Sequence, residues 1–561
     1  MSKKIKYSSN QLAKYIADAP GVVKNYIQAL EKQVGNLANI GLALSKEKNM
    51  SKLLEMILIE AKRIANSDGG TLYMMTDDNR LRFEIMMTDS LDFHMGGTSG
   101  KEIPFYPVKL YDEEGNPNKS MIAAYVGLTG ETVNIPDAYK AKGFDFSGTK
   151  MFDEKTGYHS QSFLTVPLKN HEDEIIGVLQ LLNAQNNNTK KIIPFASDIQ
   201  EMVEALASQA AVAITNKNLI KDLEALFESF IKLIASAIDA KSPYTGGHCA
   251  RVPEITMLLA KAVQETIDGP FADISFTDKE MYELKIAAWL HDCGKVATPE
   301  FVVDKSTKLE TIYDRVNEVE TRFAALKRDE QIKSLRNELK VERDDSLSKE
   351  EKLIKIKTLK SKYSKKLREL KSDLEFIKES NIGGEFMSGD KKDRVHNISN
   401  YRWKPNGKME NFLSDDEVYN LTIPRGTLTA EERKVINDHI VVTINMLEEL
   451  PYPKHLKNVP EFAGGHHEKL DGTGYPKGLT KDEMSVQARI MAIADIFEAL
   501  TAKDRPYKKG KTLSQAMRIL GFMKNDAHID VDLFDIFVKD KIYLKYAEEH
   551  LDPDQIDEVQ M

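Results

Sequence analysis

Residues 464–476 read GGHHEKLDGTGYP, which sets two adjacent histidines and two carboxylates directly before a glycine-rich turn. Imidazole is a good ligand for iron, zinc, nickel or manganese, and adjacent histidines on an extended backbone can serve one cation or two. Glycine favours the close turn because such turns need positive φ. The stretch therefore suits a metal site better than a core, although the pair His466-His467 taken alone also fits two surface residues.

Two further segments place candidate ligands in apolar surroundings. Residues 289–295 read WLHDCGK and follow an apolar helical run from Leu284, and Gly294 is a natural helix stop. We therefore expect His291 and Asp292 in a last helical turn. Residues 490–500 read IMAIADIFEAL, a nearly all-apolar helix in which Asp495 has no charged residue for several positions before it. A buried carboxylate is costly unless a cation or hydrogen bonds compensate it, which extends the metal hypothesis to this helix.

The order and local contexts of these residues resemble those of the HD-GYP phosphodiesterases, and the match around Gly-Tyr-Pro is highly specific. The resemblance implies two divalent cations, iron or manganese with nickel or zinc as alternatives, bridged by Asp292. Members with three metals carry an extra carboxylate about one turn before the first histidine. Tyr244 occupies that position here, which favours two metals. The implied metal ligands are His248, His291, Asp292, His439, His466, His467 and Asp495.

The resemblance also implies hydrolysis of cyclic di-GMP to pGpG, with continuation to GMP left open. Two cations about 3.5 to 4 Å apart can clamp a phosphodiester for in-line displacement and lower the pKa of water. Lys295 can place positive charge beside a phosphate oxygen or protonate the leaving oxygen, so we expect Lys295 and Asp292 to be catalytic. The expected substrate-binding residues are Lys295, Tyr475, Arg505 and Lys508, although one extra residue before Arg505 departs from the commoner family spacing.

Other functions fit part of this pattern. An HD phosphohydrolase acting on other nucleotides is the nearer enzymatic alternative, but that superfamily does not require the Gly-Tyr-Pro loop. A phosphodiesterase for 3′,3′-cyclic GMP-AMP is a narrower alternative. A catalytically silent cyclic-nucleotide receptor or scaffold belongs to a different class. Its discriminating feature would be missing ligands, and none of the seven is missing. The sequence therefore favours an enzyme.

Residues 36–217 have a mixed α and β pattern, with a helix expected at 50–65 and strands at 71–76, 81–87, 162–168 and 174–183. The last two strands resemble the closing strands of a GAF domain, a small-ligand sensor or dimerisation module. KMFDEKTGY at 150–158 resembles part of the motif in cyclic-nucleotide-binding GAF domains, but Tyr139-Lys140 stands nearby instead of an Asn-Lys pair. A cyclic-nucleotide ligand and a purely structural loop both remain open.

Residues 1–35 have the pattern of a helical lead-in, and residues 198–240 that of one long helix without proline or glycine. Such a helix suits a linker that pairs with its copy in a homodimer, or a helix packed on its own domain. The apolar stripe expected along it comprises Leu206, Ala210, Ala213, Ile220, Leu223, Phe227 and Phe230.

Residues 226–310 and 410–551 form the two parts of the expected HD-GYP domain, an all-α bundle. Between them, residues 311–380 show apolar spacings of three and four in two arms broken at 344–348, where Ser348 and Glu351 form a capping box. We predict an inserted antiparallel helical hairpin, whose basic second arm favours a solvated face over a dock for an anionic partner. Residues 381–409 have the composition of a loop that can reach the active site. A second capping box, Thr429 with Glu432, is expected to open the helix that carries His439.

Composition limits the class of protein. The 561 residues are 41% apolar and 29% charged, which indicates a folded multidomain chain of roughly three to four units. The net charge of −9 argues against direct nucleic-acid binding. Cys249 and Cys293 cannot form a disulfide framework, and no run of about 18 apolar residues occurs, so we expect a cytoplasmic protein without a membrane span. The expected fold is an α+β GAF domain, a linker helix and an all-α HD-type bundle with the inserted hairpin.

Overall fold

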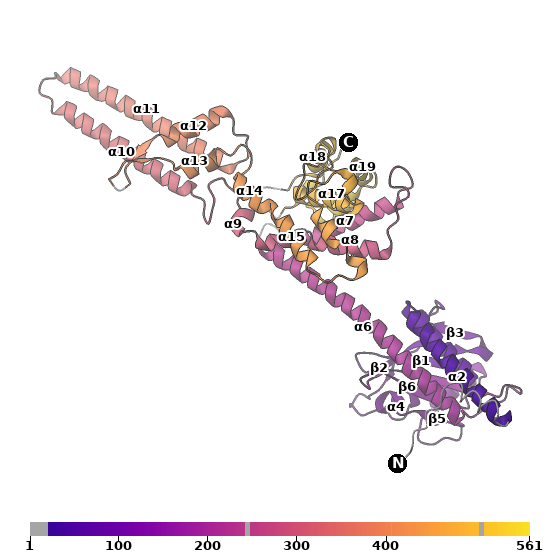
Figure 1. The fold of residues 1–561 in the computed structure, drawn as a ribbon. Helices are drawn as coiled ribbons and strands as arrows, with labels where there is room; N and C mark the ends of the chain where they lie inside the picture. The colour runs from indigo at the N-terminus through magenta and orange to yellow at the C-terminus, as the bar shows by residue number, and fades with distance from the viewer. Residues whose placement is uncertain (1–20, 242–246, 406, 504–509, 561) are drawn as a thin grey trace, which may run out of the picture. The chain divides into compact units, whose positions relative to one another are not determined.

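The computed structural model describes residues 21–241, 247–405, 407–503 and 510–560. The chain divides into two compact units, Met1–Ala225 and Leu226–Met561. The chain passes from the first to the second once, within helix α6 (Ser197–Lys241; Figure 1). No helix in the described ranges combines the length and the apolar composition that a membrane crossing requires.

The first unit is built on one antiparallel sheet with the strand order β3-β2-β1-β7-β6-β5, while β4 pairs with β2 and β8 with β7. The long central pair aligns Leu72 opposite Leu179. The four expected strands are present; three are longer than the sequence indicated, and the one expected at 162–168 is shifted by one residue. The strands are β1 (Ser67–Met75), β2 (Arg80–Thr88), β3 (Phe93–Gly96), β4 (Val108–Lys109), β5 (Val133–Ile135), β6 (Phe163–Lys169), β7 (Ile175–Gln185) and β8 (Ile192–Ile193).

Helices cover both faces of this sheet because its strands alternate apolar side chains between two cores. On one face, α2 (Gly21–Lys46), α3 (Met50–Ala65) and the first half of α6 pack against Leu72 and Leu179. On the other face, α4 (Ile122–Thr129) packs against Tyr73 and Val178. A further helix of this unit, α5 (Ser147–Thr156), follows β5 in the chain. The predicted boundary at residue 35 is wrong: α2 continues to Lys46, because its last turns bury Leu44 in the first core. Residues 1–20 of the expected lead-in lie outside the described residues.

Helix α6 has the predicted extent, but its apolar residues do not form one stripe. Leu206 and Ala210 are buried in the core of the first unit, whereas Ile231 and Ile238 are buried in the core of the second. A separate row on α6 is exposed and repeats at spacings of seven, four, three, four and three residues. It comprises Val212, Leu219, Leu223, Leu226, Phe230 and Leu233.

The second unit is a helical bundle around one large core that includes residues from α6, α7, α8, α16, α17, α18, α19 and α20. Its helices outside the insertion are α7 (His248–Glu265), α8 (Asp278–Leu290), α9 (Glu300–Val303), α14 (Ala430–Asn437), α15 (His439–Glu448), α16 (Val459–Gly464), α17 (Val486–Thr501), α18 (Leu513–Asn525), α19 (Val531–Lys539) and α20 (Ile542–His550), with 3-10 turns η2 (Cys293–Ala297), η3 (Lys454–Leu456), η4 (Lys481–Glu483) and η5 (Pro553–Gln555).

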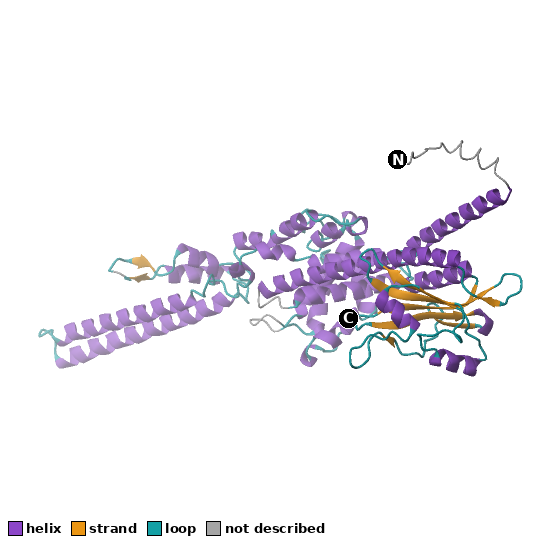
Figure 2. Cartoon of the chain, turned by 90° about the horizontal axis from the view of Figure 1, so that it is seen from below, coloured by secondary structure: helices purple, strands orange, loops and turns teal. Residues whose placement is uncertain are grey.

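The insertion contains the expected hairpin, α10 (Val316–Glu342) beside α11 (Lys349–Ile382), joined by a short loop (Figure 2). The predicted loop at 381–409 is wrong in part, because α12 (Gly389–Ser399) and the short strand β9 (Arg402–Trp403) form within it. Val395 and Ile398 of α12 pack into a core of the insertion itself, together with α13 (Asp415–Leu421); β10 (Glu410–Asn411) pairs with β9. Residues 381–409 are therefore part of the folded insertion.

Candidate metal centre

Five separate segments of the second unit bring all seven predicted ligands into one buried cluster. The Nε2 atom of His248 lies 3.2 Å from Asp292 Oδ2 and 3.2 Å from Asp495 Oδ1. The Nε2 atom of His291 lies 3.3 Å from that of His248, and His439 Nε2 lies 3.2 Å from Asp292 Oδ1. His466 and His467 approach His439 from the turn after α16, with ligand nitrogens of the three within 4.8 Å of one another.

The predicted helical turn around His291 and Asp292 needs correction. Helix α8 ends at Leu290, and Gly294 lies inside the 3-10 turn η2 instead of closing the helix. Glycine is required there by close packing, because a Cβ atom at Gly294 would lie 2.0 Å from the carbonyl oxygen of His439. The missing side chain allows η2 to pack directly on α15, which brings Asp292 to His439.

The helix expected to open at Thr429 and carry His439 is two helices. The capping box of Thr429 and Glu432 starts α14, as predicted, but α14 ends at Asn437. His439 is the first residue of α15, with Asp438 between the two helices. Since the start of α15 packs against η2, the break places the imidazole at the cluster.

Hydrogen bonds fix the ring orientation of four histidines. His291 Nδ1 lies 2.7 Å from the carbonyl oxygen of Ala288, and His466 Nδ1 lies 2.6 Å from that of Ala463. His439 Nδ1 makes the same bond to the carbonyl three residues before it. A carbonyl only accepts, so Nδ1 carries the hydrogen and the lone pair on Nε2 is free to bind a metal. His248 Nδ1 instead donates to the carboxylate of Glu498.

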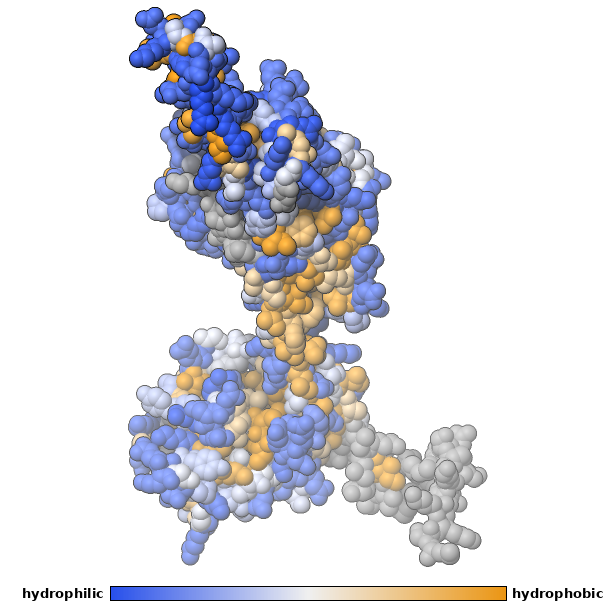
Figure 3. All heavy atoms as spheres, turned by 90° about the vertical axis from the view of Figure 1, so that its left-hand side faces the viewer, coloured by the Kyte–Doolittle hydropathy of each residue, from blue (hydrophilic) through white to orange (hydrophobic). Residues whose placement is uncertain are grey.

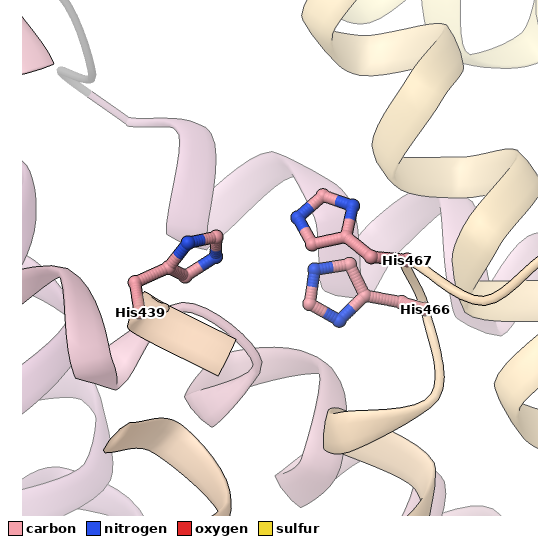
Figure 4. Close-up of side chains that lie close together, drawn as sticks. All are labelled: His439, His466 and His467. Atoms are coloured by element: carbon pink, nitrogen blue, oxygen red, sulfur yellow. The ribbon is translucent and has the colours of Figure 1, made fainter. Parts of the chain in front are cut away.

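Three atoms of the cluster are buried without a hydrogen-bond partner among the described residues: Asp292 Oδ1, His439 Nε2 and His466 Nε2. Buried polar atoms normally have partners, so this donor set fits metal ligands. The ligand atoms form one group of His439, His466 and His467 and a second of His248, His291 and Asp495, and His291, Asp292 and His466 form a third that joins them. Figure 4 shows the three imidazoles of the first group gathered together. Asp292 directs Oδ1 to the first group and Oδ2 to the second, the arrangement a bridging carboxylate needs.

Burial and charge set the protonation of the cluster. Burial opposes protonation of His291, but neighbouring Asp292 outweighs it and raises the pKa of His291 to about 9. Burial lowers the pKa of His467 to about 4. Although burial favours its neutral form, Lys295 and His291 hold the pKa of Asp292 well below its usual range. The Lys295 ammonium lies 2.5 Å from Asp292 Oδ2, so this predicted catalytic residue does reach the cluster.

One supporting residue, Glu498, was not found from the sequence. Glu498 is 1% exposed; one of its oxygens accepts from His248 and the other from Arg251, whose Nε lies 2.7 Å away. Glu498 follows Asp495 by three residues and so lies on the same face of α17. That spacing was the only local signal, because its partners are about 250 residues earlier in the chain.

The Gly-Tyr-Pro loop is held by another buried carboxylate. Glu468 is 1% exposed and accepts hydrogen bonds from the backbone N–H groups of Lys477 and Leu479, at 2.7 and 3.0 Å. Gly474 packs on the Glu468 backbone so closely that a Cβ atom would lie 2.5 Å from its Cα. The loop is thereby folded back on the histidine pair, and the Tyr475 ring stacks on His467 at 4.9 Å.

A cavity of about 350 Å³ opens beside the cluster. Tyr475 lines it, as expected of a substrate-binding residue, together with His467 and Asp495. Lys469 and Lys511 also line it and were missed, because isolated lysines carry no signal in a sequence rich in them. The predicted substrate residues Arg505 and Lys508, and Tyr244 on which the metal count rested, lie outside the described residues.

In the first unit, the segment that resembles a cyclic-nucleotide motif has an internal structural role. Asp153 is buried and accepts hydrogen bonds from the Tyr139 hydroxyl at 2.6 Å and from the backbone N–H and hydroxyl of Ser160 at 2.8 and 2.7 Å. Both carboxylate oxygens are therefore occupied by the domain's own groups. This arrangement supports the structural interpretation of the loop.

Comparison with known families identifies both units. Residues 49–214 match the GAF domain, and residues 415–533 match the HD domain. The HD match includes His439, His466, His467 and Asp495, and the other three cluster residues precede the insertion. The chain is thus a multidomain protein with a GAF domain and an HD domain.

Curated relatives match the chain over short segments. It is 39% identical over 107 residues to the 3′3′-cGAMP-specific phosphodiesterase 3 of Vibrio cholerae, covering 19% of this chain and 22% of that protein. It is 43% identical over 81 residues to phosphodiesterase 1 of the same specificity and organism, covering 14% and 19%. A cyclic di-GMP phosphodiesterase of Pseudomonas aeruginosa is 45% identical over 74 residues, covering 13% and 17%. The chain therefore matches about a fifth of the length of these relatives.

Proposed function

We propose that this chain, in which a GAF domain precedes an HD domain, is a metal-dependent phosphodiesterase of the HD-GYP type that hydrolyses cyclic di-GMP to pGpG. The observation that supports it most is the cluster of seven candidate ligand side chains, in which buried atoms of Asp292, His439 and His466 have no hydrogen-bond partner among the described residues. Lys295 beside this cluster and the adjoining cavity supply a place for a phosphodiester.

The cluster residues would bind the metals, and Lys295 would act on the substrate. Two divalent cations, iron or manganese with nickel or zinc as alternatives, would be held by the two ligand groups and would supply Lewis acidity to a phosphodiester and acidify water. Asp292 would hold both groups in register. Burial opposes the charge of Lys295, but Asp292 and Asp495 raise the pKa of its ammonium group, so Lys295 stays protonated near neutral pH. Lys295 can then neutralise a phosphate oxygen or protonate the leaving sugar oxygen.

The cyclic dinucleotide itself is the open choice between two candidates. Two of the relatives are named for 3′3′-cGAMP and one for cyclic di-GMP, and a substrate of either kind carries two phosphodiesters. The cavity is lined by Lys469, Lys511 and Tyr475, which offer two cations and an aromatic face to a phosphate and a base. These groups serve both substrates, so 3′,3′-cyclic GMP-AMP is the second candidate.

The test is turnover by anaerobically purified protein whose metals have been counted. Each cyclic dinucleotide is supplied separately and the products are separated by chromatography, with Asp292→Ala as the control. Linear dinucleotide that appears with the native chain and is lost in the control supports the proposal. Two bound metals without turnover of either substrate would contradict it, and absence of metal would favour a silent receptor.

We also propose that the chain is a homodimer joined along α6, with a small ligand at the GAF domain as its input. The exposed row from Val212 to Leu233 keeps the spacing of a coiled-coil seam, and Leu223 and Leu233 are 68% and 63% exposed. Apolar side chains lie along this helix in Figure 3. Leu223→Glu should produce a monomer in sedimentation analysis. A variant that remains dimeric would contradict this interface.

A further inference from the structure

The last turn of α6 is bonded to two segments that carry members of the metal cluster. Asp239 Oδ2 accepts from the backbone N–H of Gly247 at 3.0 Å, and Oδ1 faces that of Cys249 at 3.5 Å. These groups flank His248, the first residue of α7. The residue before α7 is Gly247, which has no side chain to cap the helix. A carboxylate from α6 therefore caps the helix that begins with a candidate ligand.

Lys241 makes a similar connection to the other side of the cluster. Its ammonium group donates to three backbone carbonyls, those of Lys295 at 3.1 Å, Val296 at 2.5 Å and Thr298 at 2.6 Å. An ammonium group has three hydrogens, so this set satisfies it completely. These carbonyls belong to η2 and to Thr298, the residue that follows it. The turn η2 begins directly after Asp292 and contains Lys295.

The turns before these residues are packed firmly in the same unit. Ile231, Ala235 and Ile238 of α6 are buried in the bundle core. The Lys285 ammonium on α8 lies 3.1 Å from Glu228 of α6, so α6 also contacts the helix that ends directly before His291. A shift or rotation of the end of α6 would therefore act on both segments at once, through a helix whose other end belongs to the GAF unit.

We infer that Asp239 and Lys241 are positioning residues that set His248 and the Asp292–Lys295 turn according to the position of α6. The inference rests on the proposed phosphodiesterase function and adds to it the route by which α6 acts on the site. Both side chains bond to backbone groups beside the cluster residues. Asp239 acts through the start of α7 and Lys241 through η2, so the two effects are separable: Asp239 governs the metal group of His248, and Lys241 governs Lys295.

The test uses the full-length chain with Lys241→Met, Lys241→Arg and Asp239→Asn. The matched controls are Lys221→Met and Asp222→Asn, which make the same chemical changes at exposed positions on the same helix. Three quantities are measured: metals bound per chain in a metal-buffered solution, kcat and KM for cyclic dinucleotide, and hydrogen exchange of peptides covering 247–253 and 293–299.

Lys241→Met should lower kcat about 10- to 100-fold with little change in KM or metal content, because a misplacement of about 1 Å near the reaction can cost that much. Exchange should rise only in 293–299, and Lys241→Arg should restore most of kcat. Asp239→Asn should raise exchange in 247–253 and reduce metal occupancy. The controls should match the native chain.

Two results would overturn the inference. One is unchanged exchange in both peptides; the other is raised exchange with native kcat and native metal content, which would make the bonds merely structural. If the native chain binds metal but turns over neither cyclic dinucleotide, the proposed function fails. The exchange and metal measurements would still decide whether Asp239 positions His248.

Discussion

Replacing Glu498 with glutamine should weaken one of the two metals and leave the other nearly unchanged. The carboxylate accepts from His248 with one oxygen and from Arg251 with the other, at an Arg251 Nη2 distance of 2.6 Å. A glutamine amide can accept with only one atom. It must either point its NH₂ group at the Arg251 guanidinium or turn it towards His248 Nδ1, which would move the imidazole hydrogen to the face that binds metal.

The size of the effect follows from the role of Glu498. Losing a carboxylate that orients a histidine ligand costs about 10- to 100-fold in metal affinity, which is about 1.4 to 2.7 kcal/mol at the usual conversion. His248 belongs to the group with His291 and Asp495, so the group of His439, His466 and His467 should keep its affinity. The expected titration of metal-free protein with Mn²⁺ therefore has two steps, of which only one moves.

Competition with a fluorescent chelator measures both steps. Glu548→Gln, the same change at an exposed position of α20, is the control and should titrate like the native chain. Glu498→Asp keeps the charge and should fall between the native chain and Glu498→Gln. Equal weakening of both steps, or none, would refute the division of the ligands into two groups.

Three further outcomes follow from the structure. Asp153→Asn should destabilise the GAF unit by about 1 to 3 kcal/mol, because one donor facing the side chain loses its acceptor; urea unfolding followed by peptide-resolved exchange should show the loss in residues 49–214 and not in the HD unit. Phe323→Ala should open the insertion core by about 3 to 5 kcal/mol, which limited proteolysis within 311–428 would detect, while metal content stays native. Chelation should lower the unfolding temperature of the HD unit, since a ligand at 1,000 times its Kd stabilises by about 4 kcal/mol; an equal decrease in the GAF unit would contradict this.

The seven cluster residues were expected as a set because their order resembles that of the HD-GYP phosphodiesterases, and three of them also stand in informative local patterns. The pair His466-His467 precedes a glycine turn, and Asp495 interrupts an apolar helix. Glu498 could not be predicted, because its role depends on a contact with His248 across about 250 residues. The same holds for Asp239 and its contacts with the start of α7.

The errors of the sequence interpretation also have local causes. Helix α12 was missed because it buries only Val395 and Ile398 among charged residues, so its periodicity is too weak to distinguish from a loop. Gly294 was assigned as a helix stop because glycine after an apolar run usually is one. Its actual requirement is the carbonyl oxygen of His439, which only the folded bundle brings there.

The insertion lies between His291 and His439 without separating them, because the residues just before it bond to the residues just after it. Lys305 donates to both oxygens of Glu432, at 2.8 and 2.9 Å, and the Thr427 hydroxyl donates to the Lys305 carbonyl at 3.0 Å. The bundle therefore closes across this junction as it would across a short loop, and the hairpin keeps a core of its own. Glu432 also caps α14, the helix that leads to His439. The outer hairpin thus has a core of its own, whereas the junction also supports the start of the helix that leads to His439.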